Sequence, residues 1–139
     1  MLNYSNTITD EKSYSGLQMK EIKPIMKLII RGKKREFLSA IGKSLNLLLP
    51  TEANTSSRSD KLTALWLSPD EWMVYSNETI NSESNEHETE NLLNKNISKT
   101  NLGAVTDVTD QFVLINLKGD KIYDLFETGS PFNFNDFRN

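Results

Sequence analysis

The stretch that decides the fold is LIIRGKKREFL, Leu28–Leu38, in which an apolar run meets a glycine and then a segment of different period. Ile25–Arg31 is apolar and β-branched, which favours a strand, and Gly32 ends it. From Lys33 to Leu45 the apolar residues recur at steps of three and four, the spacing of a helix with one buried face. The sequence therefore predicts a strand, a turn and an amphipathic helix.

A second stretch, LINLKGDKIYDL from Leu114, repeats the order of strand, basic residue, glycine and helix. Gly119 is expected to end the strand and Asp120 to cap the helix Lys121–Thr128. The predicted buried stripe of this helix consists of Ile122, Leu125 and Phe126. The repeat favours two related βαβ-like halves that share a sheet. Any split βαβ fold produces similar repeated patterns, so the alternative that the two halves are not related stays open.

Further strands and one more helix are predicted between and around these stretches. Leu62–Leu67 and Trp72–Ser76 are apolar, and Pro69 and Asp70 between them favour the turn of a β-hairpin. The other expectations are a strand from Leu17 broken at Pro24, a polar loop over Thr51–Asp60, a helix marked by Leu92, Leu93 and Ile97, and strands over Ala104–Val108 and Phe112–Leu117. The predicted fold class is α+β, with a mixed or antiparallel sheet, two or three helices and split βαβ units.

The chain has 139 residues, the size of one ordinary domain. Residues 1–16 are polar and uneven, so we expect a flexible N-terminal tail, followed by a single α+β domain over residues 17–139. The net charge of -3, from 16 basic and 19 acidic residues, gives no electrostatic reason to expect nucleic acid or an anionic membrane as a partner.

The residue inventory also bears on compartment and chemistry. The chain has no cysteine, which excludes disulfides, thiolate catalysis and iron–sulfur ligation. Met1–Asp10 lacks the basic start and apolar run of a secretory signal, and the longest apolar runs are too short to span a membrane. We therefore expect a cytoplasmic protein without a membrane segment.

Three groups of residues have the types of side chain or backbone group that a chemical site needs. The turn Gly32-Lys33-Lys34 could present helix N–H groups to a phosphate, but it lacks the spacing of a nucleotide-binding loop, and a plain turn is favoured. His87 stands between two glutamates in a polar stretch, which is typical of a solvated loop residue rather than a metal ligand. Asp107 and Asp110 are better explained by local hydrogen bonds to the backbone than by acid–base catalysis. We expect no catalytic, cofactor-binding or metal-binding residue in this chain.

Two tryptophans and two acidic residues mark the predicted hairpin. Asp70 and Glu71 are most simply turn formers, and Trp66 and Trp72 are either core or edge aromatics. An exposed tryptophan at this place would instead indicate a partner surface. The candidate subunit-interface residues are therefore Trp66, Asp70, Glu71, Trp72, Phe132 and Phe134.

The string LWLSPDEWMVY, Leu65–Tyr75, resembles the L-x-L-G-P-D-E-W-L signature of the gamma subunit of heterotetrameric sarcosine oxidase. Other pieces follow in that family's order: Leu28–Gly32 is similar to its strand ending in Leu-Arg-Gly, Leu49-Pro50 to its Leu-Pro, Ala104–Asp110 to its Val-Asp-Val-Ser-Asp, and Leu117–Gly119 to its Leu-Ser-Gly. The resemblance spans roughly residues 17–137. Ser68 replaces the usual glycine, Ser130 the usual cysteine, and the family continues past this point with more strands and a helix.

The resemblance implies a non-catalytic structural subunit of a complex that oxidatively demethylates sarcosine to glycine, with tetrahydrofolate as the one-carbon acceptor. It implies a fold like that of the folate-binding aminomethyltransferases. It also implies that FAD, FMN, NAD, tetrahydrofolate and zinc belong to partner subunits of the alpha, beta and delta types.

Two other functions stay open from the sequence. One is a free-standing folate-binding or aminomethyltransferase-like protein, and the other is an unrelated interaction module. If the domain is C-terminally incomplete, as the resemblance implies, an unpaired sheet edge and apolar surface are expected near Phe132, Phe134 and Phe137.

Overall fold

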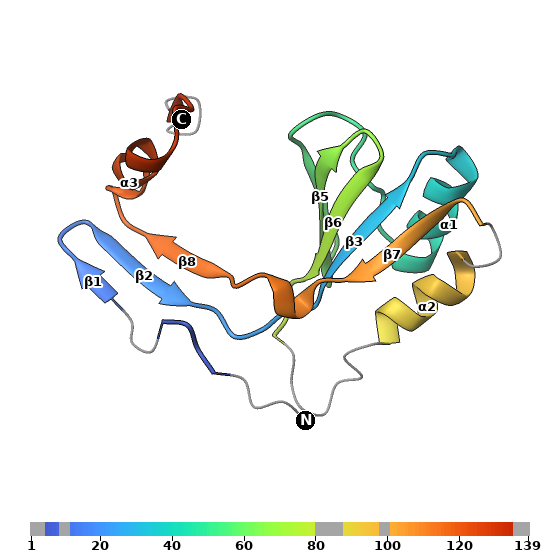
Figure 1. Cartoon of the computed structure of the whole chain (residues 1–139), viewed down its shortest axis with the longest axis horizontal. Helices are drawn as coiled ribbons and strands as arrows, with labels where there is room; N and C mark the ends of the chain where they lie inside the picture. The colour runs from blue at the N-terminus through green and yellow to red at the C-terminus, as the bar shows by residue number, and fades with distance from the viewer. Residues whose placement is uncertain (1–4, 9–11, 80–87, 98–100, 135–139) are drawn as a thin grey trace. The chain divides into compact units, whose positions relative to one another are not determined.

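The computed structural model describes residues 5–8, 12–79, 88–97 and 101–134, which form the strands and helices of Figure 1. The chain divides into two compact units, and each has a sheet of its own. Unit 1 contains residues 1–22 and 113–139, and unit 2 contains residues 23–112. The predicted α+β class is confirmed, and every strand pair among the described residues is antiparallel. The expectation of one domain over residues 17–139 stays a prediction.

Unit 2 is a split βαβ arrangement. Its elements are β3 (Lys27–Gly32), α1 (Arg35–Leu45), β4 (Ser56–Arg58), β5 (Leu62–Ser68), β6 (Glu71–Ser76), α2 (Glu88–Ile97), β7 (Gly103–Asp107) and the short 3-10 helix η1 (Thr109–Gln111). The strand order is β4-β5-β6-β3-β7. Strand β6 therefore lies between β3 and β5, and the chain passes from β3 to β5 through α1 and the short strand β4. A strand placed between the two that a helical crossover links is the defining feature of the split βαβ motif.

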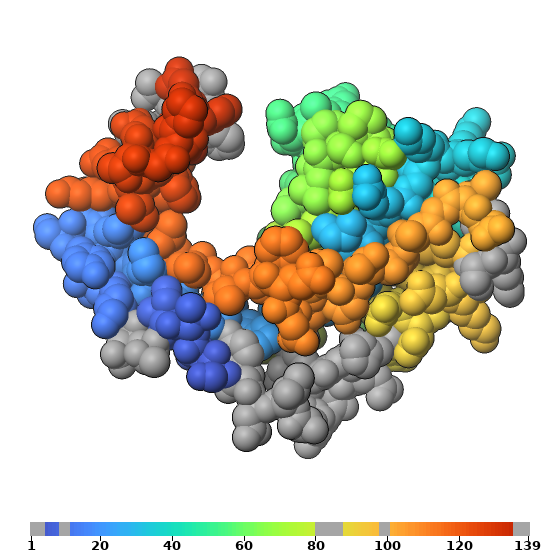
Figure 2. All heavy atoms as spheres, in the orientation of Figure 1, coloured from blue at the N-terminus to red at the C-terminus, as the bar shows by residue number. Residues whose placement is uncertain are grey.

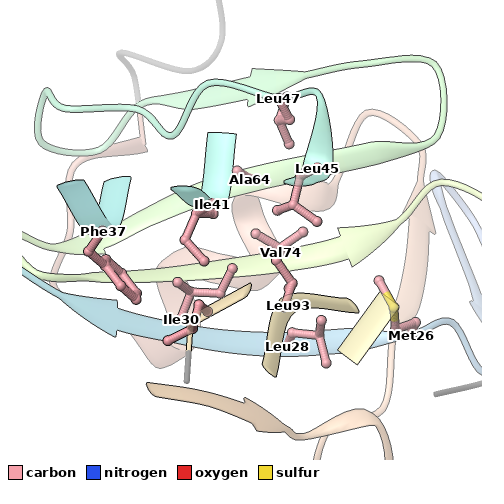
Figure 3. Packing of buried hydrophobic residues seen from close by; sticks show 11 residues of the cluster. Met26, Leu28, Ile30, Phe37, Ile41, Leu45, Leu47, Ala64, Val74 and Leu93 are labelled. Carbon is pink, nitrogen blue, oxygen red and sulfur yellow. The ribbon is translucent and has the colours of Figure 1, made fainter. Parts of the chain in front are cut away.

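The hydrophobic core of unit 2 lies between one face of this sheet and the two helices. Register places Leu28 opposite Val74, and Val74 opposite Ala64, so these residues share a face. Figure 3 shows Val74 surrounded by side chains from the helices and β3. The cluster consists of Met26, Leu28, Ile30, Phe37, Ile41, Leu45, Leu47, Ala64, Val74, Leu93 and Ile97. The predicted apolar stripe of α1 is confirmed.

Phe37 requires two glycines in the neighbouring strands. Gly32 and Gly103 are register partners in β3 and β7, and a Cβ atom on either would lie 2.3–2.4 Å from the Phe37 ring. The buried ring therefore packs directly on bare backbone. Gly32 thus has a packing role in addition to ending the strand.

Unit 1 is a three-stranded sheet followed by a helix. Its elements are β1 (Lys12–Tyr14), β2 (Leu17–Glu21), β8 (Ile115–Lys118) and α3 (Ile122–Gly129), with strand order β1-β2-β8. Residues 12–14 of the expected tail form strand β1, which pairs with β2. The Ile8 N–H also donates to Glu21 Oε2 at 2.7 Å. The tail expectation is therefore wrong for these residues.

Three other expectations for this half of the chain are wrong. β3 and β8 belong to different sheets, so the two strand–glycine–helix stretches do not share one. Lys121 rather than Asp120 precedes α3, and no side chain caps the helix. The stripe of α3 is not buried, because Leu125 and Phe126 are 36% and 40% exposed. The periodicity correctly predicts a helix, but burial also needs an opposing surface.

Candidate interaction surfaces

The predicted hairpin is formed by β5 and β6, and its turn is tied to β3. The pairing shifts register between Trp66 and Ser68, and Pro69 and Asp70 separate the strands. Ser68 Oγ donates to Asp70 Oδ1 at 2.9 Å, and the Gly32 N–H donates to the Asp70 carbonyl at 3.0 Å. The Gly32 N–H is thus used within the fold, which agrees with the plain-turn interpretation of Gly32-Lys33-Lys34.

Charged side chains of β3 and the following turn face the acidic residues of the hairpin. Lys33 Nζ lies 3.5 Å from Asp70 Oδ2, and Arg31 Nε lies 3.9 Å from Glu71 Oε2. The hydrogen bond from Ser68 and the charges of Lys33 and Arg31 hold the pKa of Asp70 below its ordinary value. Asp70 is therefore a turn former, as expected, and its carboxylate favours the ionised state.

The two tryptophans of the hairpin differ in exposure. They are register partners on β5 and β6, but Trp72 is 2% exposed and its Nε1–H donates to the Pro50 carbonyl at 2.7 Å, whereas Trp66 is half-buried. The sequence left open whether each tryptophan is a core or an edge aromatic. Trp72 is a core aromatic and has no ring surface left for a partner. Trp66, Asp70 and Glu71 remain candidates for an interface.

Leu67 is an exposed apolar residue that the sequence analysis did not single out. It lies at the register shift between Trp66 and Ser68 and is 43% exposed. The LWL string indicated a strand, but alternation alone did not predict which leucine the shift would turn outward. Leu67 adds an apolar side chain to the charged end of the hairpin.

Phe132 and Phe134 lie in unit 1 and form an aromatic cluster with Phe126 of α3. The ring centroids of Phe126 and Phe134 are 5.4 Å apart, and those of Phe132 and Phe134 are 5.2 Å apart. Phe132 remains 53% exposed. Phe126 is the member that the sequence analysis missed, because its helical spacing indicated a buried position. The predicted Phe137 lies outside the described residues.

Asp107 and Lys27 meet at the end of β7. The Thr109 N–H donates to Asp107 Oδ1 at 2.7 Å, and Thr109 Oγ1 accepts the Lys27 N–H at 3.0 Å. The local backbone role expected for Asp107 is therefore confirmed. The Lys27 side chain is buried, and Nζ donates to the Ile25 carbonyl at 3.0 Å. Burial lowers the pKa of Lys27, and the charges of Asp110 and Asp107 oppose part of that effect.

The described residues hold neither a cluster of metal-ligand side chains nor a membrane-spanning helix. No three side chains of the His, Cys, Asp or Glu types gather there as metal ligands would. In the same part of the chain no helix is both long and apolar enough to cross a bilayer. His87 lies outside the described residues.

Comparison with known proteins shows a likeness of fold. No family model matches the sequence, and no curated relative matches it. Among solved structures, the chain is similar to one chain of the heterotetrameric sarcosine oxidase from Corynebacterium sp. U-96 in complex with pyrrole 2-carboxylate, with a TM-score of 0.73 and 16% sequence identity. The match covers 87% of this chain and 59% of that chain. The α+β fold described above is therefore that of a chain found in a sarcosine oxidase heterotetramer.

Proposed function

We propose that this chain is a non-catalytic, gamma-type structural subunit of a heterotetrameric sarcosine oxidase. The observation that carries the proposal is the structural match over 87% of the chain to one chain of such an enzyme. The ordered motifs around Leu65–Tyr75 and Ala104–Asp110 support it independently, because they come from the sequence. The subunit acts in the cytoplasm and contributes no catalytic residue to the complex.

In this proposal the chemistry lies in the partners. The alpha, beta and delta subunits hold FAD, FMN, NAD, tetrahydrofolate and zinc, and together they oxidise sarcosine to glycine. The polar groups described above support this division, because the Gly32 N–H, the Asp70 carboxylate and the Asp107 carboxylate each bond within the fold. The hairpin end, with Trp66, Leu67, Asp70 and Glu71, is the proposed contact with a partner in unit 2. Phe132 and Phe134 are the proposed contact in unit 1.

The proposal is tested by co-expressing the tagged chain with the alpha, beta and delta subunits of a sarcosine oxidase from the same genome. We expect flavin absorbance and sarcosine-dependent oxygen uptake to co-purify with the tag. Recovery of the chain without flavoprotein, while the other three subunits assemble without it, would contradict the proposal.

A matched pair of variants tests the hairpin surface in the same experiment. Leu67→Asp adds a charge beside Trp66, and Leu48→Asp adds one at a leucine that is 82% exposed and outside the hairpin. We expect Leu67→Asp to reduce flavin recovery and Leu48→Asp to leave it unchanged. Equal recovery with both variants would remove the hairpin end from the interface.

A titration of the isolated chain with tetrahydrofolate separates the proposal from a free-standing folate-binding protein. The subunit proposal expects no heat signal and no change in tryptophan fluorescence. Saturable binding would instead favour the folate-binding alternative.

A further inference from the structure

We draw no further inference here: the strongest candidate, the apolar patch of Phe126, Phe132 and Phe134 at the end of α3 and in the segment after it (red in Figure 2), carries none because nothing in the structure shows what covers it.

Discussion

At the scale of single residues, Phe37 and the two glycines beneath it restrict unit 2 most tightly. A Cβ atom on Gly103 would lie 2.3 Å from the Arg31 carbonyl oxygen as well as from the Phe37 ring. Backbone atoms cannot move aside as a flexible side chain can. We therefore expect Gly103→Ala to lower the free energy of unfolding by about 1–3 kcal/mol, the usual range for overpacking.

Gly42→Ala is the matched control for this prediction. Gly42 lies inside α1, and an added Cβ atom there would be 3.5 Å from its nearest neighbour, an ordinary contact. Alanine is favoured over glycine in a helix by up to about 1 kcal/mol. Urea unfolding of both variants should give changes of opposite sign. Similar losses of stability in the two would contradict the packing argument.

Trp72 gives a second prediction at the residue scale. Trp72→Phe removes the hydrogen bond from Nε1 to the Pro50 carbonyl and part of the buried ring. We expect a loss of about 1–2 kcal/mol in the free energy of unfolding. Trp66→Phe, at the half-buried register partner, should cost less. Denaturant melts followed by circular dichroism compare the two, and a greater loss for Trp66→Phe would show that the core assignment of Trp72 is wrong.

At the scale of elements, the hairpin turn should make stability depend on pH. Because the pKa of Asp70 is lowered from its ordinary value of 3.8 in the folded chain, its contribution is fully present above that pH. The contribution is lost as the pH falls below 3.8 and through the lower pKa of the folded state. Urea midpoints of wild type and Asp70→Asn should therefore differ by a constant amount near neutral pH and converge in acid.

Ser68→Ala is the control for the cause of this dependence. The hydrogen bond from Ser68 is the largest contribution to the lowered pKa of Asp70. Ser68→Ala should therefore bring the folded-state pKa of Asp70 closer to 3.8 and make the loss of stability in acid smaller. An unchanged acid profile would attribute the shift to Lys33 and Arg31 instead.

At the scale of the whole molecule, burial is unequal between the two units. The hydrophobic core lies in residues 23–112, and unit 1 has no buried hydrophobic side chain among its described residues. Segments with few buried apolar contacts open at low free energy. In a dilute monomeric sample, amide hydrogen exchange should be slow in β3, β5, β6 and α1 and fast in β2, β8 and α3. Strong protection throughout residues 104–126 would contradict this prediction.

By itself the sequence determined most of the elements and the fold class. The periodicity of Phe37, Ile41 and Leu45 predicted α1, and Pro69 and Asp70 predicted the hairpin, because such signals depend on residues close together in the chain. The split βαβ pattern could be predicted for the same reason. β4 was missed because its Ser-Ser-Arg sequence has no strand signal, and it forms only by pairing with β5.

Tertiary structure alone decided which surfaces are covered. Trp66 and Trp72 are alike in sequence context, and only packing beside Pro50 buries one of them. Leu125 and Phe126 have the spacing of a buried stripe, but they remain 36% and 40% exposed. The division into two sheets was likewise beyond the sequence. The physical reason is that burial and pairing belong to contacts between distant parts of the chain, and a local pattern records only what a segment is able to bury.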